Sequence, residues 1–145
     1  MFIIFAVIMS PRRKRYRRIS GPPALRGYKP IGIPRVQLEE IILLFEEYEA
    51  LKLADYEKLT QEEAAKCMDI SRPTFTRIYE SCRKKLAQAF VEAKAIIIEG
   101  GNVSFDKNWY RCGHCYTVFE KDYAEKCDSC NTTDITNINT SLNKK

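Results

Sequence analysis

The spacing of four cysteines near the C-terminus constrains the fold of this chain more than any other feature. They form two C-x-x-C pairs with eleven residues between the pairs: Cys112, Cys115, Cys127 and Cys130. Each pair brings two thiolates to one turn, and two such turns can surround one metal ion as a tetrahedron. The spacing therefore predicts a small metal-binding module with these four cysteines as its ligands.

Two further cysteines, Cys67 and Cys82, fall within segments of helical periodicity. Six cysteines could form three disulfides, but the paired spacing favours metal binding, which requires reduced thiols. We therefore expect Cys67 and Cys82 to be reduced and buried, and the protein to be cytoplasmic. His114 lies inside the first pair, and we expect it to face solvent. Four cysteines leave no open position for a catalytic zinc, so we expect a binding protein and not an enzyme.

The chain begins with nine apolar residues that are followed directly by a basic run. A signal peptide carries its positive charge before the apolar run, and a membrane helix needs about twenty residues. The segment matches neither, so the sequence predicts no membrane partner. Met9 followed by Ser10 and Pro11 is typical of a translation start, which makes residues 1–8 a candidate for a mis-assigned extension.

Charge is distributed unevenly, although the net charge of the 145 residues is only +5. Residues 12–18 carry six Lys or Arg and no acid, whereas residues 37–66 carry nine acids against three Lys. Prolines and glycines exclude a regular helix from residues 10–35, which predicts an extended basic arm. Such an arm is either a solvated tail or a contact to DNA phosphates and the minor groove. Its candidate contacts are Arg12, Arg13, Lys14 and Arg15.

Three helical segments are expected after the arm. Periodic apolar residues predict a core-packing helix from Val36 to about Tyr56. A short second helix follows Thr60, which forms a capping box with Glu63. Ser71 is then the expected cap of a third helix that runs to about residue 93.

The turn between the second and third helices is short. Asp69 lies there, at a position that usually holds Gly, and Asp is among the few other residues that tolerate a left-handed backbone. Two helices joined by such a turn indicate a helix-turn-helix motif.

In such a motif the second helix enters the major groove and reads bases from its N-terminal half. The candidate base contacts are Arg72, Thr74, Thr76, Arg77 and Glu80. Arg77 is best suited to guanine, because its planar fork matches the two acceptors of that base. Arg83, Lys84 and Lys85 lie farther along the helix, where we expect phosphate contacts. The alternative is a solvated basic helix face without a partner.

A β-branched run at residues 95–98 predicts a strand, and Gly100-Gly101 marks a boundary after it. The predicted domains are therefore a basic arm at 1–35, a helix-turn-helix domain at 36–101, a zinc ribbon at 102–135 and a flexible tail at 136–145.

Residues from about Pro11 to Gly101 closely resemble a prokaryotic family of uncharacterised, predicted DNA-binding proteins. The helix-turn-helix of that family is similar to region four of sigma factors. The resemblance implies sequence-specific binding of double-stranded DNA and transcription regulation, and it supports Met9 as the start. It covers about two thirds of the chain and rests on the following runs: Pro11-Arg12-Arg13-Lys14, Ile19-Ser20-Gly21-Pro22-Pro23, Tyr28-Lys29-Pro30, Glu47-Tyr48-Glu49-Ala50-Leu51, Leu53-Ala54-Asp55-Tyr56, Gln61-Glu62-Glu63-Ala64-Ala65, Ile70-Ser71-Arg72-Pro73-Thr74-Phe75 and Glu99-Gly100-Gly101.

The cysteine module resembles a zinc ribbon, and the residues before each cysteine pair resemble those of rubredoxin-like domains. Rubredoxin-type knuckles usually have Gly directly after the second cysteine, whereas this chain has Tyr116 and Asn131. Tyr fits a left-handed turn less easily than Asn, so we favour structural Zn²⁺. The alternative is iron, in a rubredoxin-like redox protein or in a metal- or redox-sensing regulator.

The sequence thus predicts a mainly α fold, in which a sigma-region-four-like helix-turn-helix domain precedes a small C-terminal β zinc ribbon. The expected function is sequence-specific binding of double-stranded DNA by a transcriptional regulator. RNA polymerase and a second copy of the chain are further candidate partners. The DNA target and the direction of regulation do not follow from the sequence.

Overall fold

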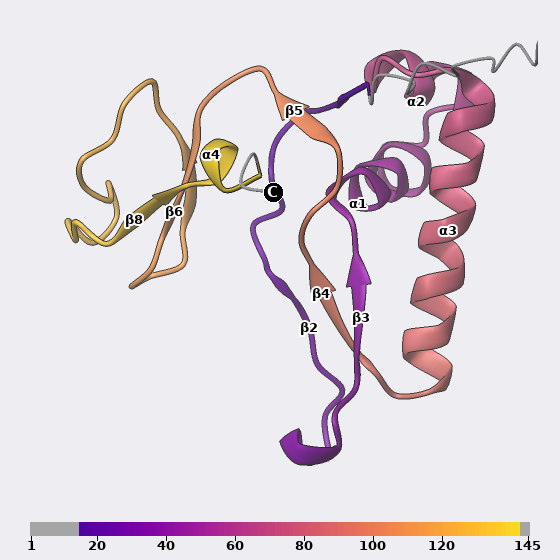
Figure 1. Ribbon diagram of the computed structural model, residues 1–145, viewed down its shortest axis with the longest axis horizontal. Coiled ribbons are helices and arrows are strands. Elements are labelled where there is room, and N and C mark those ends of the chain that lie inside the picture. Colours follow the sequence, from indigo (N-terminus) through magenta and orange to yellow (C-terminus); the bar gives the residue numbers. More distant parts are fainter. Residues whose placement is uncertain (1–14, 143–145) are drawn as a thin grey trace, which may run out of the picture.

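The computed structural model describes residues 15–142, and the expectations for residues 1–8, Arg12, Arg13 and Lys14 lie outside this range. A helical unit covers one sheet, and a smaller β module lies to one side (Figure 1). The elements in chain order are β1 Arg17–Ile19, β2 Gly27–Tyr28, the 3-10 helix η1 Arg35–Gln37, β3 Glu40–Leu43, α1 Phe45–Leu51, the π-helix η2 Lys52–Tyr56, α2 Gln61–Cys67, α3 Arg72–Val91, β4 Ala95–Ile98, β5 Val103–Phe105, β6 Trp109–Cys112, β7 Val118–Glu120, β8 Ile135–Asn137 and α4 Ile138–Leu142.

The fold is not mainly α, because 36% of the described residues are helical and 20% form strands in several sheets. The expected helix from residue 36 to about 56 accounts for part of the difference. Its first part forms η1 and β3, and α1 begins only at Phe45. Ile41 and Ile42 pair in parallel with Ile96 and Ile97, so these β-branched residues extend a sheet and do not begin a helix.

The main sheet has the order β2-β4-β3, with β4 in the centre. β3 and β4 are parallel, and the chain between them forms all of α1, η2, α2 and α3. β2 comes from the predicted arm and pairs antiparallel with β4. Gly27 is required in β2, because a side chain there would overlap the carbonyl oxygen of Ile96.

α2 and α3 begin where the capping residues predict. The Glu63 amide donates to Thr60 Oγ1 at 3.2 Å, and the Thr60 amide donates to Glu63 Oε2 at 2.9 Å. The Thr74 amide donates to Ser71 Oγ at 3.4 Å. Asp69 in the connecting turn has φ 54°, so the predicted left-handed turn is confirmed.

The core of the helical unit lies where α1, α2, α3 and the sheet meet. Phe75, Met68 and Ala64 are fully buried there. Cys82 is buried as expected, and the burial raises the pKa of its thiol to about 12. Cys67 is exposed, which corrects the expectation of two buried thiols. It is the last residue of α2, and it follows the buried positions that pack on α3.

The β module is a three-stranded antiparallel sheet of order β7-β6-β8. Residues 136–142, which the sequence assigns to a flexible tail, form the end of β8 and α4. β1 from the predicted arm pairs in parallel with β5, which leads into the module. In residues 15–142, no helix is long and apolar enough to cross a membrane.

Candidate functional site

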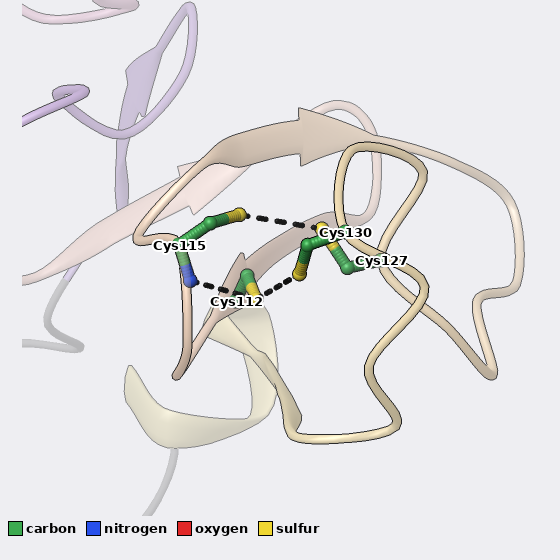
Figure 2. Close-up of side chains that lie close together, drawn as sticks. All are labelled: Cys112, Cys115, Cys127 and Cys130. Carbon is green, nitrogen blue, oxygen red and sulfur yellow. Dashed lines mark hydrogen bonds between the residues drawn. The ribbon is translucent and has the colours of Figure 1, made fainter.

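The structure brings the four predicted cysteine ligands together in the β module (Figure 2). Cys112 ends β6 and Cys115 follows in the next turn, whereas Cys127 and Cys130 lie between β7 and β8. All four Sγ atoms lie within 4.8 Å of one another. The Sγ atoms of Cys112 and Cys130 are 3.6 Å apart, and those of Cys115 and Cys127 are also 3.6 Å apart.

These distances fit a metal site and not disulfides. A disulfide requires sulfurs about 2.05 Å apart. Zn–S bonds of about 2.3 Å place the sulfurs of a regular tetrahedron roughly 3.8 Å apart, close to the separations seen here. The four cysteines are thus compatible with one tetrahedrally bound metal ion, which would cross-link the two turns.

The two cysteine turns share one backbone geometry. The Cys112 amide donates to the Thr117 carbonyl at 3.0 Å, and the Cys127 amide donates to the Thr132 carbonyl at 2.9 Å. Between these hydrogen-bonded residues, Tyr116 and Asn131 have φ 61° and 59°. Both turns therefore adopt the left-handed conformation that favours glycine.

Sequence reasoning missed the two threonines. Both follow the second cysteine of a pair by two residues, so the chain contains C-x-x-C-x-T twice, and this repeat was the available signal. Thr117 also contributes its side chain, because its Oγ1 lies 3.2 Å from Cys115 Sγ.

Hydrogen bonds at the first turn favour the thiolate form of Cys115, which is the form that binds metals. The pKa of Cys115 is lowered to about 6, mainly by the hydrogen bonds of its sulfur with the side chain and backbone of Thr117. The amides of His114 and Cys115 both donate to Cys112 Sγ at 3.3 Å. The His114 side chain is exposed, as expected for a residue that is not a ligand.

The predicted base contacts lie on the N-terminal half of α3, away from the cysteines. Arg72, Arg77, Glu80 and Lys84 are exposed. Within the part of the chain that the structure describes, none of these four side chains forms an ion pair. Their charges therefore face solvent without compensation. Arg77 Nε is 3.4 Å from the Pro73 carbonyl, within the same helix.

Other polar residues of α3 are engaged within the protein. Thr76 Oγ1 donates to Gln61 Oε1 at 2.5 Å and thereby joins α3 to α2. Thr74 Oγ1 lies 2.8 Å from Ser71 Oγ at the helix cap. Lys85, expected to hold phosphates, instead donates to the buried carboxylate of Glu47 at 2.7 Å.

The predicted basic arm enters the fold beside the turn between α2 and α3. The Arg18 amide in β1 donates to the Met68 carbonyl in that turn at 3.0 Å. Arg15, the first residue that the structure describes, is exposed and lies three positions earlier in the chain. The start of the described arm is therefore anchored next to the N-terminus of α3.

The fold and the cysteine cluster define a mixed α and β protein with a site that could hold a metal ion. A family model described as "Protein of unknown function DUF134" matches residues 7–106. The chain belongs to this family, whose members in other organisms are called UPF0251 proteins.

Relatives match over most of their length. The UPF0251 protein of Chloroherpeton thalassium is 44% identical over 120 residues, which are 83% of this chain and 80% of the relative. That of Clostridium tetani is 43% identical over 119 residues, or 82% and 81% of the two chains. The Caldanaerobacter subterraneus protein is 51% identical over 92 residues, or 63% and 78%. No solved structure matches the chain.

Proposed function

We propose that this protein binds double-stranded DNA sequence-specifically and regulates transcription, with α2 and α3 as a helix-turn-helix and with Zn²⁺ as a structural ion in the cysteine cluster. One observation carries the DNA-binding proposal. α3 packs on the core through Phe75 and carries four exposed cations without an ion pair in the described chain: Arg72 and Arg77 in its N-terminal half, and Arg83 and Lys84 farther along.

The contrast with other cations of the helical unit supports this proposal. Lys52, Lys66, Lys85 and Lys94 all form ion pairs with carboxylates. Unpaired positive charge is therefore present on α3, including the N-terminal half that meets DNA in a helix-turn-helix, and it is also present at Lys58 just before α2. The hydrogen bond from Thr76 to Gln61 fixes the orientation of α3 relative to α2.

The anchoring of β1 extends the basic surface. The Arg18 amide is bound to the turn before α3, so the arm enters the fold there and Arg15 precedes this anchor by three residues. The side chains of Arg17 and Arg18 are paired with Glu46 and Asp106, so Arg15 is the cation at the start of the described arm that is left for DNA. An arm that starts there can contact phosphates or the minor groove next to the groove that α3 occupies.

Salt dependence tests the DNA-binding mode. A preferred duplex is first selected from a random pool with the zinc-loaded chain, and its affinity is then measured by fluorescence anisotropy at several salt concentrations. Phosphate anchoring predicts a linear fall of log K with log salt. An affinity that barely changes with salt would exclude the proposed mode.

Arg77→Ala tests base reading by α3. If Arg77 binds a guanine, we expect the variant to lose about 1–3 kcal/mol of discrimination between the selected duplex and a changed one. Arg35→Ala is the control, because Arg35 is an exposed arginine in η1, at the end of the molecule opposite to α2 (Figure 1). An equal loss of affinity for all duplexes would show that Arg77 contacts a phosphate and does not read a base.

Iron is the second candidate for the cysteine site. Tyr116 and Asn131 adopt the left-handed conformation at the positions where rubredoxin-type knuckles usually have Gly, and this observation favours iron. Within the first pair, the backbone amides of His114 and Cys115 also donate to Cys112 Sγ. Metal analysis and visible absorbance of untagged protein separate the candidates. Stoichiometric iron and a reversible red colour would replace the zinc proposal with a redox one.

A further inference from the structure

An open cleft of about 1520 Å³ lies between the main sheet and the β module. Its lining includes Arg26, which precedes β2, and Arg111, which comes from β6. No lining residue belongs to α2 or α3, so the cleft is separate from the proposed base-reading helix, although Tyr16 comes from the arm.

Arg111 is incompletely paired in this cleft. One Nη donates to the Pro23 carbonyl at 3.2 Å, and Nε is buried without a hydrogen-bond partner among residues 15–142. A buried donor without an acceptor is costly, so such atoms call for an explanation. Nε itself is enclosed by the protein, so an acceptor in the cleft would bind the guanidinium through its Nη atoms and offset only part of that cost.

Arg111 shares the cleft with a second cation, Arg26. Burial lowers the pKa of the Arg111 guanidinium, and the positive charge of Arg26 lowers it further. Glu46 and Glu99 also line the cleft, but Glu46 pairs with Arg17 at 3.4 Å. Across the described chain, no ion pair joins a carboxylate to Arg26 or Arg111. Two cations without a carboxylate partner in residues 15–142 therefore line the same cleft.

Two exposed aromatic rings line the same cleft. Tyr16 is 60% exposed and Tyr116 is 66% exposed, so both rings have free surface for stacking. Arginines bind phosphate through two parallel hydrogen bonds, and tyrosine rings stack on bases.

We propose that this cleft binds a phosphate-bearing small molecule of the nucleotide class. Arg26 and Arg111 hold the phosphates, and Tyr16 or Tyr116 contacts the base. The proposal does not depend on DNA binding by α3, because the two sites share no residue.

Calorimetric titration of the full, metal-loaded chain with ATP at constant ionic strength tests the proposal. Pyrophosphate and adenosine, titrated separately, measure the contributions of the phosphates and of the base. Trp109 gives a second signal, because it is the only tryptophan and lies two residues before Arg111, on the same side of β6. We expect saturable ATP binding that changes Trp109 emission, and weaker binding of either fragment.

Three variants locate the site. We expect Arg26→Gln and Arg111→Gln each to weaken ATP binding about tenfold or more, because each removes charged hydrogen bonds to phosphate. Arg35→Gln removes the same charge outside the cleft and should leave affinity unchanged. Arg26 is exposed, so its variant keeps the test valid even if Arg111→Gln does not fold.

Absence of a saturable heat would overturn the proposal, as would equal losses in all three variants. A single-stranded oligonucleotide is the last probe. If it binds far more tightly than ATP and depends on Arg26 in the same way, the cleft recognises a nucleic-acid strand and the nucleotide proposal is wrong.

Discussion

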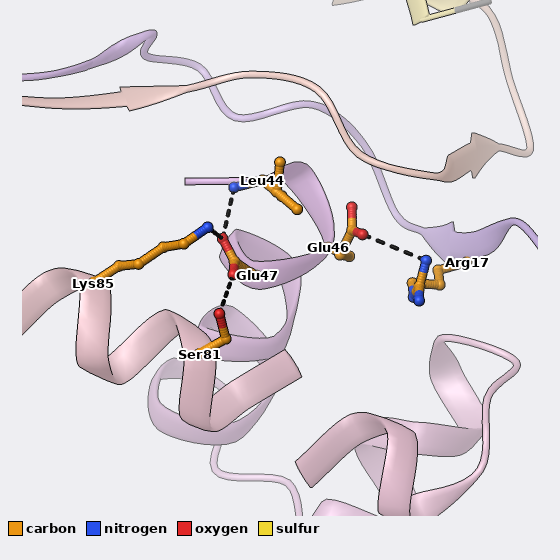
Figure 3. Close-up of polar contacts among 6 residues, drawn as sticks. All are labelled: Arg17, Leu44, Glu46, Glu47, Ser81 and Lys85. Atoms are coloured by element: carbon orange, nitrogen blue, oxygen red, sulfur yellow. Dashed lines mark hydrogen bonds and ion pairs between the residues drawn. The ribbon is translucent and has the colours of Figure 1, made fainter. Parts of the chain in front are cut away.

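Lys85 Nζ lies 2.7 Å from Glu47 Oε2, and this ion pair ties α3 to the first turn of α1 (Figure 3). The Glu47 side chain is only 4% exposed, yet its oxygens also accept hydrogen bonds from the Leu44 amide at 2.8 Å and from Ser81 Oγ at 2.6 Å. One buried carboxylate therefore caps one helix and holds another against it.

Lys85→Met tests the energetic role of this pair. The substitution leaves a buried carboxylate without its counter-charge, so we expect a loss of about 2–3 kcal/mol in the free energy of unfolding, measured with urea. Lys84→Met is the matched control, because Lys84 is exposed and should change stability by less than about 0.5 kcal/mol. Similar losses in both variants would show that the pair contributes little.

Glu46 makes stability depend on pH. Burial raises the pKa of its carboxyl above 4.5, although hydrogen bonds from its own amide and the charge of Arg17 oppose the shift. The folded state thus binds a proton more tightly than the unfolded state does. The resulting stabilisation is complete below the unfolded pKa and is lost as pH rises through the folded pKa.

Glu46→Gln is neutral at every pH, so it does not lose this stabilisation. We expect its melting temperature to rise relative to that of the parent protein as pH increases from 4.5 to 7.5. Differences are taken between the two proteins at each pH, which cancels effects of pH on the cysteine cluster. A difference that stays constant over this range would contradict the raised pKa.

Metal removal should affect the β module before the helical unit. The main apolar core contains residues of the helices, of the main sheet and of the β1–β5 pair, and none from β6, β7 or β8. Chelation therefore removes the cross-link of a module with little core of its own. We expect Trp109 emission to shift to the red while helical circular dichroism is retained. Simultaneous loss of both signals would show that the two parts unfold together.

Tyr116→Gly should stabilise the module. A left-handed residue with a side chain costs roughly 1–2 kcal/mol, and the added freedom of glycine in the unfolded chain offsets part of the gain. We expect a net gain of about 0.5–1 kcal/mol in urea unfolding followed by Trp109 emission. Tyr123→Gly is the control, since Tyr123 is exposed in the same module and is not left-handed. Stabilisation by both variants would refute a role for the turn.

Local signals made part of this structure predictable. The cysteine spacing, the Thr60 and Ser71 caps and the turn at Asp69 each depend on residues close in sequence, and each is found where it was expected. The approach of the four cysteines to one another was predictable in part for the same reason, because the two cysteines of each pair lie within one turn.

Long-range pairing accounts for what the sequence did not reveal. Ile41 and Ile42 fit a helix or a strand equally well, and only their pairing with β4 selects the strand. Glu47 lies in the first turn of α1, and the local sequence indicates only that its charge favours a helix start. Its partners Ser81 and Lys85 lie 34 and 38 residues away, too far for any local pattern to predict them.

The parallel pairing of β3 with β4 also has a kinetic consequence. It closes a loop formed by residues 44–94, which contains α1, α2 and α3. Closing so long a loop costs entropy that only packed helices can offset. The three helices can associate through contacts closer in sequence, whereas the main sheet needs both ends of that loop. The helices of this protein should therefore fold first, and the pairing of β3 with β4 should form last.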